Sequence, residues 1–190
     1  MLDDLKSATA KTVDLLQAAC PSELPSTPPG RMAAMRSRIE AMLKAVQVVR
    51  PALDQFYQSL NDEQKERFNA LDQNNRPPRE PDLARLCGGG SGGVSASLPV
   101  DRIEHKLHLS AGQNADLKDL TQASAKARDL LKATCRPKQT LTPTGRLTAM
   151  QDRLTAVLQA VDTVRPELAK FYNSLRDEQK ARFDRLARPA

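Results

Sequence analysis

The sequence predicts an all-α protein built from two tandem copies of one helical unit, and three observations support this. Residues 5–71 align without a gap with residues 120–186, at a constant offset of 115 positions, and roughly half of the paired positions are identical. Aromatic residues make up only 3% of the chain and tryptophan is absent, whereas residues that favour helices are abundant. Apolar residues recur at spacings of three and four, the period of one helix face. We expect two antiparallel helical hairpins, each containing one long kinked helix.

The first copy begins with a helix expected over residues 2–19, which carries one apolar face and ends at Cys20. Thr27 then N-caps a second helix, and Pro28 suits its first turn because an N–H there would lack a helical partner anyway. Pro51 predicts a kink in this helix, with the helix continuing beyond it. The narrow apolar seam of this helix and its counterpart comprises Met32, Met35, Ile39, Met42, Val46, Val49, Leu53 and Phe56, then Leu147, Met150, Leu154, Val157, Val161, Val164, Leu168 and Phe171.

Three further helices are expected to start at related capping sequences. Asn61 can cap one helix while Gln64 reaches back from the N3 position, the arrangement of a capping box. In the second copy Arg176 cannot cap, so Asp177 is expected to substitute one residue later. The predicted capping residues are Leu60, Asn61, Gln64, Leu109, Ser110, Gln113, Leu175, Asp177 and Gln179.

The repeat divides the chain into a first unit over 1–72, a linker rich in proline and glycine over 73–98, and a second unit over 99–190. Met1 aligns with Asp116, so the segment ahead of Asp116 in the second unit has no counterpart in the first. We expect an upstream truncation that removed the N-terminal helix of the first unit. If that unit needs the missing helix, self-association or a domain-swapped homodimer is expected.

Because of the order of its capping sequences and helices, the chain resembles the LTXXQ-motif family of periplasmic Spy and CpxP-like proteins. In that family, the sequence Leu-Thr-x-x-Gln precedes two helices. Here the motif reads Leu-Asn-x-x-Gln from Leu60, Leu-Ser-x-x-Gln from Leu109 and Leu-Arg-x-x-Gln from Leu175, so threonine never occupies its position. The resemblance implies a cradle-shaped antiparallel dimer that holds unfolded clients on a basic, partly apolar face without ATP. It also implies a periplasmic location, with the signal peptide absent from this chain and presumed removed or truncated.

The leading functional hypothesis is therefore an ATP-independent periplasmic chaperone for unfolded or stressed envelope proteins, although the sequence does not identify the client-binding residues. The alternative is an envelope stress or metal-responsive sensor that binds a partner protein or a cation. An enzyme is not expected, since no nucleophile with a base, phosphate-binding glycine loop or metal triad occurs, and no cofactor is expected. The net charge of +6 favours acidic partners, but no nucleic-acid recognition motif and no membrane-spanning apolar run are present.

Cysteine and histidine residues supply two candidate sites. Cys20 and Cys135 are equivalent by the repeat, which leads us to expect a Cys87–Cys135 disulfide in an oxidising compartment, the alternative being three reduced buried cysteines. His105 and His108 lie three apart on a short helix and can present two imidazoles to a metal, but a polar helix face is the favoured interpretation because the nearby sequence supplies no third or fourth ligand.

The methionines and tyrosines carry two further expectations. Met32, Met35, Met42 and Met150 are expected to pack in the core rather than form an adaptable client surface or a soft-metal site. The hydroxyls of Tyr57 and Tyr172 are expected to be exposed at the ends of the bundle.

Overall fold

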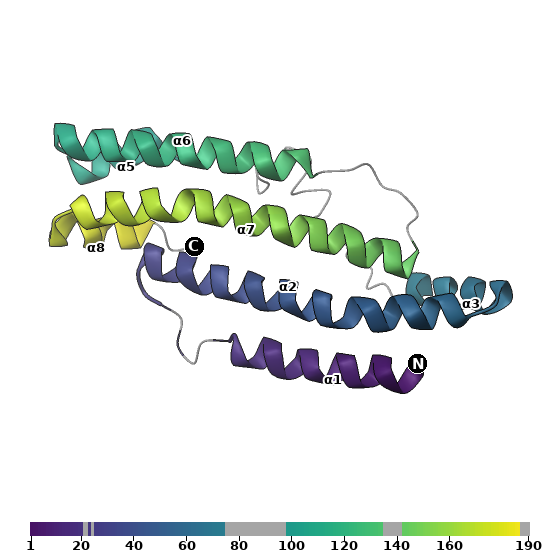
Figure 1. Cartoon of the computed structure of the whole chain (residues 1–190). Helices are drawn as coiled ribbons and strands as arrows, with labels where there is room; N and C mark the ends of the chain where they lie inside the picture. The colour runs from purple at the N-terminus through teal and green to yellow at the C-terminus, as the bar shows by residue number, and fades with distance from the viewer. Residues whose placement is uncertain (21–22, 24, 75–97, 135–141, 187–190) are drawn as a thin grey trace.

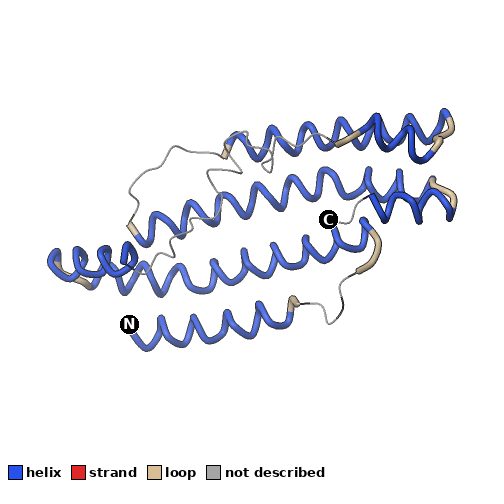
Figure 2. The backbone as a smooth tube through the Cα atoms, turned by 180° about the vertical axis from the view of Figure 1, so that it is seen from behind, coloured by secondary structure: helices blue, strands red, loops and turns tan. Residues whose placement is uncertain are grey.

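The computed structural model describes residues 1–20, 23, 25–74, 98–134 and 142–186, and within these residues all regular structure is helical (Figures 1 and 2). The all-α prediction is confirmed. The helices are α1 (Leu2–Ala18), α2 (Pro28–Ser59), α3 (Asp62–Asn74), α5 (Val100–Leu107), α6 (Ala111–Ala133), α7 (Pro143–Ser174) and α8 (Asp177–Leu186).

Four long helices lie side by side in the order α1, α2, α7, α6, and each runs antiparallel to its neighbours (Figure 1). The α1–α2 hairpin of the first unit therefore meets the α6–α7 hairpin of the second through α2 and α7. Two polar contacts join these two helices. Arg36 Nε donates to Asp162 Oδ1 over 2.6 Å, and Arg50 donates to Oε1 of Gln151, the counterpart of Arg36, over 2.7 Å. One polypeptide thus contains two similar halves that pack against each other.

Both long helices start where the sequence places their caps. The Thr27 hydroxyl accepts a hydrogen bond from Gly30 N at 3.3 Å, and the Thr142 hydroxyl accepts one from Gly145 N at 3.2 Å. A Cβ atom at Gly30 would lie 2.8 Å from Pro25 Cβ and 2.9 Å from the Thr27 hydroxyl oxygen, so this tight start leaves no room for a side chain. Both helices continue through their internal prolines to Ser59 and Ser174, and the kink stays a prediction.

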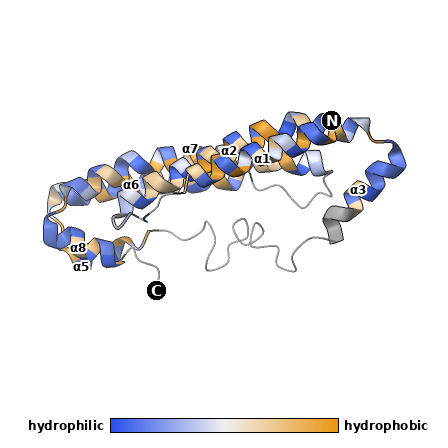
Figure 3. Ribbon diagram, turned by 90° about the horizontal axis from the view of Figure 1, so that it is seen from below, coloured by the Kyte–Doolittle hydropathy of each residue, from blue (hydrophilic) through white to orange (hydrophobic). Residues whose placement is uncertain are grey.

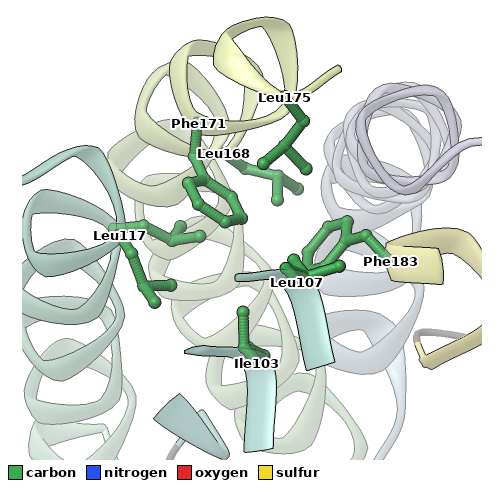
Figure 4. Packing of buried hydrophobic residues seen from close by; sticks show 8 residues of the cluster. Ile103, Leu107, Leu117, Leu168, Phe171, Leu175 and Phe183 are labelled. Carbon is green, nitrogen blue, oxygen red and sulfur yellow. The ribbon is translucent and has the colours of Figure 1, made fainter. Parts of the chain in front are cut away.

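Short helices fold back at the two ends of this four-helix layer. Helices α5 and α8 lie at one end and α3 at the other, all on the same side of the layer (Figure 3). The main apolar core lies at the α5–α8 end, where buried side chains point toward one another (Figure 4). This core consists of Ile103, Leu107, Leu117, Leu120, Leu168, Phe171, Leu175 and Phe183.

The expectation that the seam methionines are core residues is wrong for two of them. Ile39 and Val46 are 6% and 4% exposed, as a seam requires, but Met35 and Met150 are 48% and 44% exposed. The physical reason is the shape of the assembly. Helices in a single layer cover one another only on their flanks, so an apolar side chain directed out of the layer has no neighbouring helix to contact.

Candidate binding surface

An open apolar groove of about 200 Å³ crosses the junction between the two units. Helix α1 contributes Leu16, α2 contributes four side chains from its middle, and α7 contributes Leu147 and Met150 from the other unit. We call this set the apolar groove; its lining residues are Leu16, Met42, Ala45, Val46, Val49, Leu147 and Met150. Figure 3 shows hydrophobic positions gathered along the same stretch of α1 and α2.

The rim of the apolar groove is accessible to a ligand while its floor is closed. Val46 in the floor is only 4% exposed, whereas Leu16 and Met150 at the rim are 37% and 44% exposed. A methionine side chain is flexible and polarisable and adapts to differently shaped apolar partners. The groove therefore offers apolar contacts without any polar group that would fix the orientation of one particular ligand.

Two glutamines form a buried hydrogen-bonded pair where α6 and α8 meet. Gln113 Nε2 donates to Gln179 Oε1 at 2.9 Å and to Ser174 O at 2.7 Å, and Gln179 Nε2 donates to Leu107 O at 3.0 Å. Their Oε1 atoms accept the backbone N–H groups of Ser110 at 3.0 Å and Arg176 at 2.9 Å, respectively. Each motif glutamine thus caps its own helix start and joins it to the other one.

The remaining capping residues differ between the units. Ser110 accepts from Gln113 N at 3.3 Å, which completes a capping box at the start of α6. In the first unit, Asn61 Oδ1 accepts from Gln64 N at 2.8 Å, and Gln64 Oε1 accepts from Asn61 N at 3.0 Å, but the Gln64 side chain is exposed. Asp177 is the first residue of α8, and the N–H of Arg176 before it is bound by Gln179.

Leu60 and Leu175 end the two long helices with nearly the same geometry but different burial. Their φ/ψ angles are −78/142 and −77/143 degrees. Leu175 is buried at 3% exposure, whereas Leu60 is only half-buried. Leu109 is partly buried and packs against the core.

Charged groups bridge the helices of the layer. Arg36 also binds Glu40 at 2.6 Å, and its hydrogen bond to Asp162 lowers the pKa of that carboxyl group and raises the pKa of the guanidinium. Lys170 of α7 lies 2.9 Å from Asp119 and 3.1 Å from Asp116 of α6, which raises its pKa. The Arg36–Asp162 pair joins α2 to α7, and the Lys170 pairs join α7 to α6, whereas the Arg36–Glu40 pair lies within α2.

The histidines of the candidate metal site lie at the end of α5. Both side chains are exposed, the ring centroids of His105 and His108 are 6.5 Å apart, and His108 adopts the left-handed conformation that ends the helix. Within the described residues, no group of three or more His, Cys, Asp or Glu side chains is arranged to hold a metal ion. The structure adds no third ligand to the pair.

The candidate disulfide lies outside the described residues, since neither Cys87 nor Cys135 is among them. Cys20 is exposed at the end of α1, with its sulfur 3.4 Å from Leu16 O. The Cys87–Cys135 disulfide stays a prediction.

The tyrosine hydroxyls are bound to the end helices rather than fully exposed. Tyr57 Oη contacts Asn69 Oδ1 at 3.3 Å, and Tyr172 Oη contacts Asp184 Oδ2 at 3.2 Å, both in partly buried positions. Desolvation, together with the nearby Asp184 carboxylate, raises the pKa of Tyr172. The two tyrosines therefore join α2 to α3 and α7 to α8.

The fold and surface define a class: an all-α protein in which two long helical hairpins pack side by side and leave an apolar groove open. The family model described as "LTXXQ motif family protein" matches residues 1–72 and 95–187, and the chain belongs to this family. Its known context is the non-enzymatic, periplasmic Spy and CpxP-like proteins. A search of curated proteins and a search of solved structures found no match. None of the described helices combines the length and apolarity that crossing a membrane requires.

The sequence did not identify the residues of the apolar groove as a surface. The signal was present in the methionines, which the sequence allows as either core or adaptable surface. The spacing of three and four between the methionines favoured a buried position in the core. Only the packing of the helices in a single layer shows that the Met150 side chain is exposed.

Proposed function

We propose that this protein is an ATP-independent, chaperone-like protein of the periplasm that binds unfolded or stressed envelope proteins through the apolar groove. The observation that carries the proposal is the open groove itself, lined only by apolar side chains from both units. Unfolded proteins expose apolar segments of varied shape, and a flexible methionine-containing surface suits such varied partners.

The charge and the family support the same proposal. The chain carries a net charge of +6, which attracts acidic segments and speeds encounter with them. Family membership places the chain among Spy and CpxP-like proteins, from which the periplasmic location and the chaperone activity are carried over as proposals. The alternative of a metal-responsive sensor has no further support among the described residues, where the histidine pair acquires no third ligand.

The test is light scattering from a chemically denatured client diluted into buffer with or without an equimolar amount of this protein. We expect suppression of aggregation, weakened by added salt because the attraction between exposed charges is screened. Met150→Glu and Leu16→Glu place a charge at the rim of the groove and are expected to reduce suppression severalfold.

Val13→Glu is the matched control, because Val13 of α1 is 47% exposed but does not line the groove. It is expected to suppress aggregation as the unmodified protein does. Absence of suppression by the unmodified protein would refute the proposed activity. Full suppression by both groove variants, with helical content intact by circular dichroism, would remove the groove as its site.

A further inference from the structure

The apolar groove contains one methionine whose counterpart in the repeat lies outside it. Met150 of α7 lines the groove and is 44% exposed. Met35 of α2 occupies the equivalent position in the first unit and is 48% exposed, but it does not line the groove. The two side chains therefore differ mainly in whether a ligand that binds in the groove contacts them.

Exposure makes both thioether sulfurs accessible to a dissolved oxidant. Hypochlorous acid transfers its oxygen atom to a methionine sulfur, which loses two electrons and becomes a sulfoxide, while the chlorine leaves as chloride and a proton is released. Met42 also lines the groove and Met32 packs against the main core, but both are only partly exposed. We therefore expect Met150 and Met35 to be oxidised before Met42 and Met32.

A sulfoxide at Met150 places a polar oxygen at the rim of a surface that offers it no partner. The described lining residues are leucine, methionine, alanine and valine, none of which carries a side-chain hydrogen-bond donor. A ligand that covers the oxygen removes its water without replacing the lost hydrogen bond, and an unpaired buried polar group weakens binding. The oxygen of a Met35 sulfoxide stays in water instead.

The place of Met150 in the groove increases the effect of this change. The second unit contributes two of the described lining side chains, Leu147 and Met150, and the first unit contributes the others. Oxidation therefore converts one of the two apolar contacts that α7 offers into a polar one. A ligand that bridges the two units loses much of its apolar contact with the second unit.

We propose that Met150 is an oxidation site that regulates the apolar groove: its sulfoxide weakens the binding of apolar polypeptide segments, and reduction of the sulfoxide restores it. The inference rests on the proposed function of the groove. Reduction takes two electrons and two protons from a dithiol, the sulfoxide oxygen leaves as water, and the dithiol becomes a disulfide. Methionine sulfoxide reductases catalyse this step, with one enzyme for each epimer of the sulfoxide.

The test treats the full-length protein with limiting hypochlorous acid, quenches the excess, and follows aggregation of a chemically denatured client by light scattering. Peptide mapping by mass spectrometry sets a dose at which Met150 and Met35 are oxidised and Met42 is not. The protein concentration that halves the scattering is expected to rise about tenfold after oxidation. Incubation with both reductases and dithiothreitol is expected to return it to its starting value.

Leucine variants at the two equivalent positions assign the effect to one sulfur. Each variant is compared with itself before and after the same treatment, so any effect of the substitution alone cancels. Oxidation is expected to change the half-maximal concentration of Met150→Leu little, whereas that of Met35→Leu rises about tenfold, as in the unmodified protein. Both variants keep all three cysteines, so oxidised thiols affect them alike.

Glutamine variants test the same contact without any oxidant. The amide of Met150→Gln is a permanent polar group on a side chain of similar length, so this variant is expected to suppress aggregation more weakly than Met35→Gln does. Equal suppression by the two glutamine variants would contradict the role of a polar group at the rim of the groove.

Three results of the oxidation experiment would overturn the proposal while the proposed function stands. They are unchanged suppression by protein in which mapping finds the Met150 sulfoxide, equal loss in Met150→Leu and Met35→Leu, and oxidation of Met42 before Met150. A loss of helical circular dichroism at the chosen dose would assign the effect to unfolding and would overturn it too. Failure of the untreated protein to suppress aggregation would refute the proposed function itself, and this regulation with it.

Discussion

Replacing Gln179 by alanine tests the central structural argument, because the chain contains the same residue in an exposed setting at Gln64. Gln179 is 3% exposed and links the starts of α6 and α8 to the end of α5. Gln64 makes the capping bond to Asn61 N at 3.0 Å but faces solvent. The two substitutions remove the same atoms from the same motif position, so burial is the main difference between them.

The expected magnitude follows from the bonds that each substitution breaks. Gln179→Ala leaves Leu107 O without its donor in a place where Leu107 is 1% exposed, and it removes the acceptor of Arg176 N. An unpaired buried polar group costs about 1–3 kcal/mol, so the free energy of unfolding is expected to fall by about 2–4 kcal/mol. Gln64→Ala is expected to cost about 0.5–1 kcal/mol, because water replaces the lost capping bond.

Urea unfolding followed by far-ultraviolet circular dichroism measures both changes. The double variant Gln113→Ala with Gln179→Ala is expected to be more stable than the sum of the two single effects predicts, since the second removal breaks a pair that is already incomplete. Equal losses for Gln64→Ala and Gln179→Ala would refute the reasoning, and so would additive effects in the double variant.

Three further predictions use matched positions or a titrating pair. Phe171→Ala is expected to lower the free energy of unfolding by about 3–5 kcal/mol, and Phe56→Ala by clearly less because Phe56 is half-buried; urea midpoints that shift equally would contradict this. Gly30→Ala is expected to cost about 1–3 kcal/mol, because its Cβ would meet Pro25 and Thr27, while Gly112→Ala, with nothing within 4 Å, is the control that should be neutral or stabilising in thermal melts. Asp162 has a pKa lowered from 3.8 by Arg36, so its contribution to stability is present above that pH and is lost as the pH falls through the lowered pKa. The difference in unfolding free energy between the unmodified protein and Asp162→Asn should therefore shrink in acid, and a difference independent of pH would argue against the pair.

Much of the local structure follows from short-range chemistry that the sequence displays directly. Thr27 and Pro28 start α2 because a hydroxyl acceptor and a residue without an N–H satisfy the first turn, wherever the helix packs. Gln113 returns to the N–H of Ser110 for the same local reason. The duplication itself indicated that two similar halves occur in one chain, which is why the all-α repeat and its family could be predicted.

The tertiary structure decided which of the equivalent residues are buried. Gln64 and Gln179 have nearly the same neighbours along the chain, yet only Gln179 meets a second glutamine among the described residues. Gln113 lies far away in sequence and reaches Gln179 only when α6 packs beside α7. Met150 has the spacing of a core residue but lies 44% exposed, since a single layer of helices leaves its two faces uncovered. Sequence periodicity reports which side of a helix is apolar, whereas burial depends on whether another element covers that side. The candidate function of this protein, at the apolar groove, arises where such cover is absent.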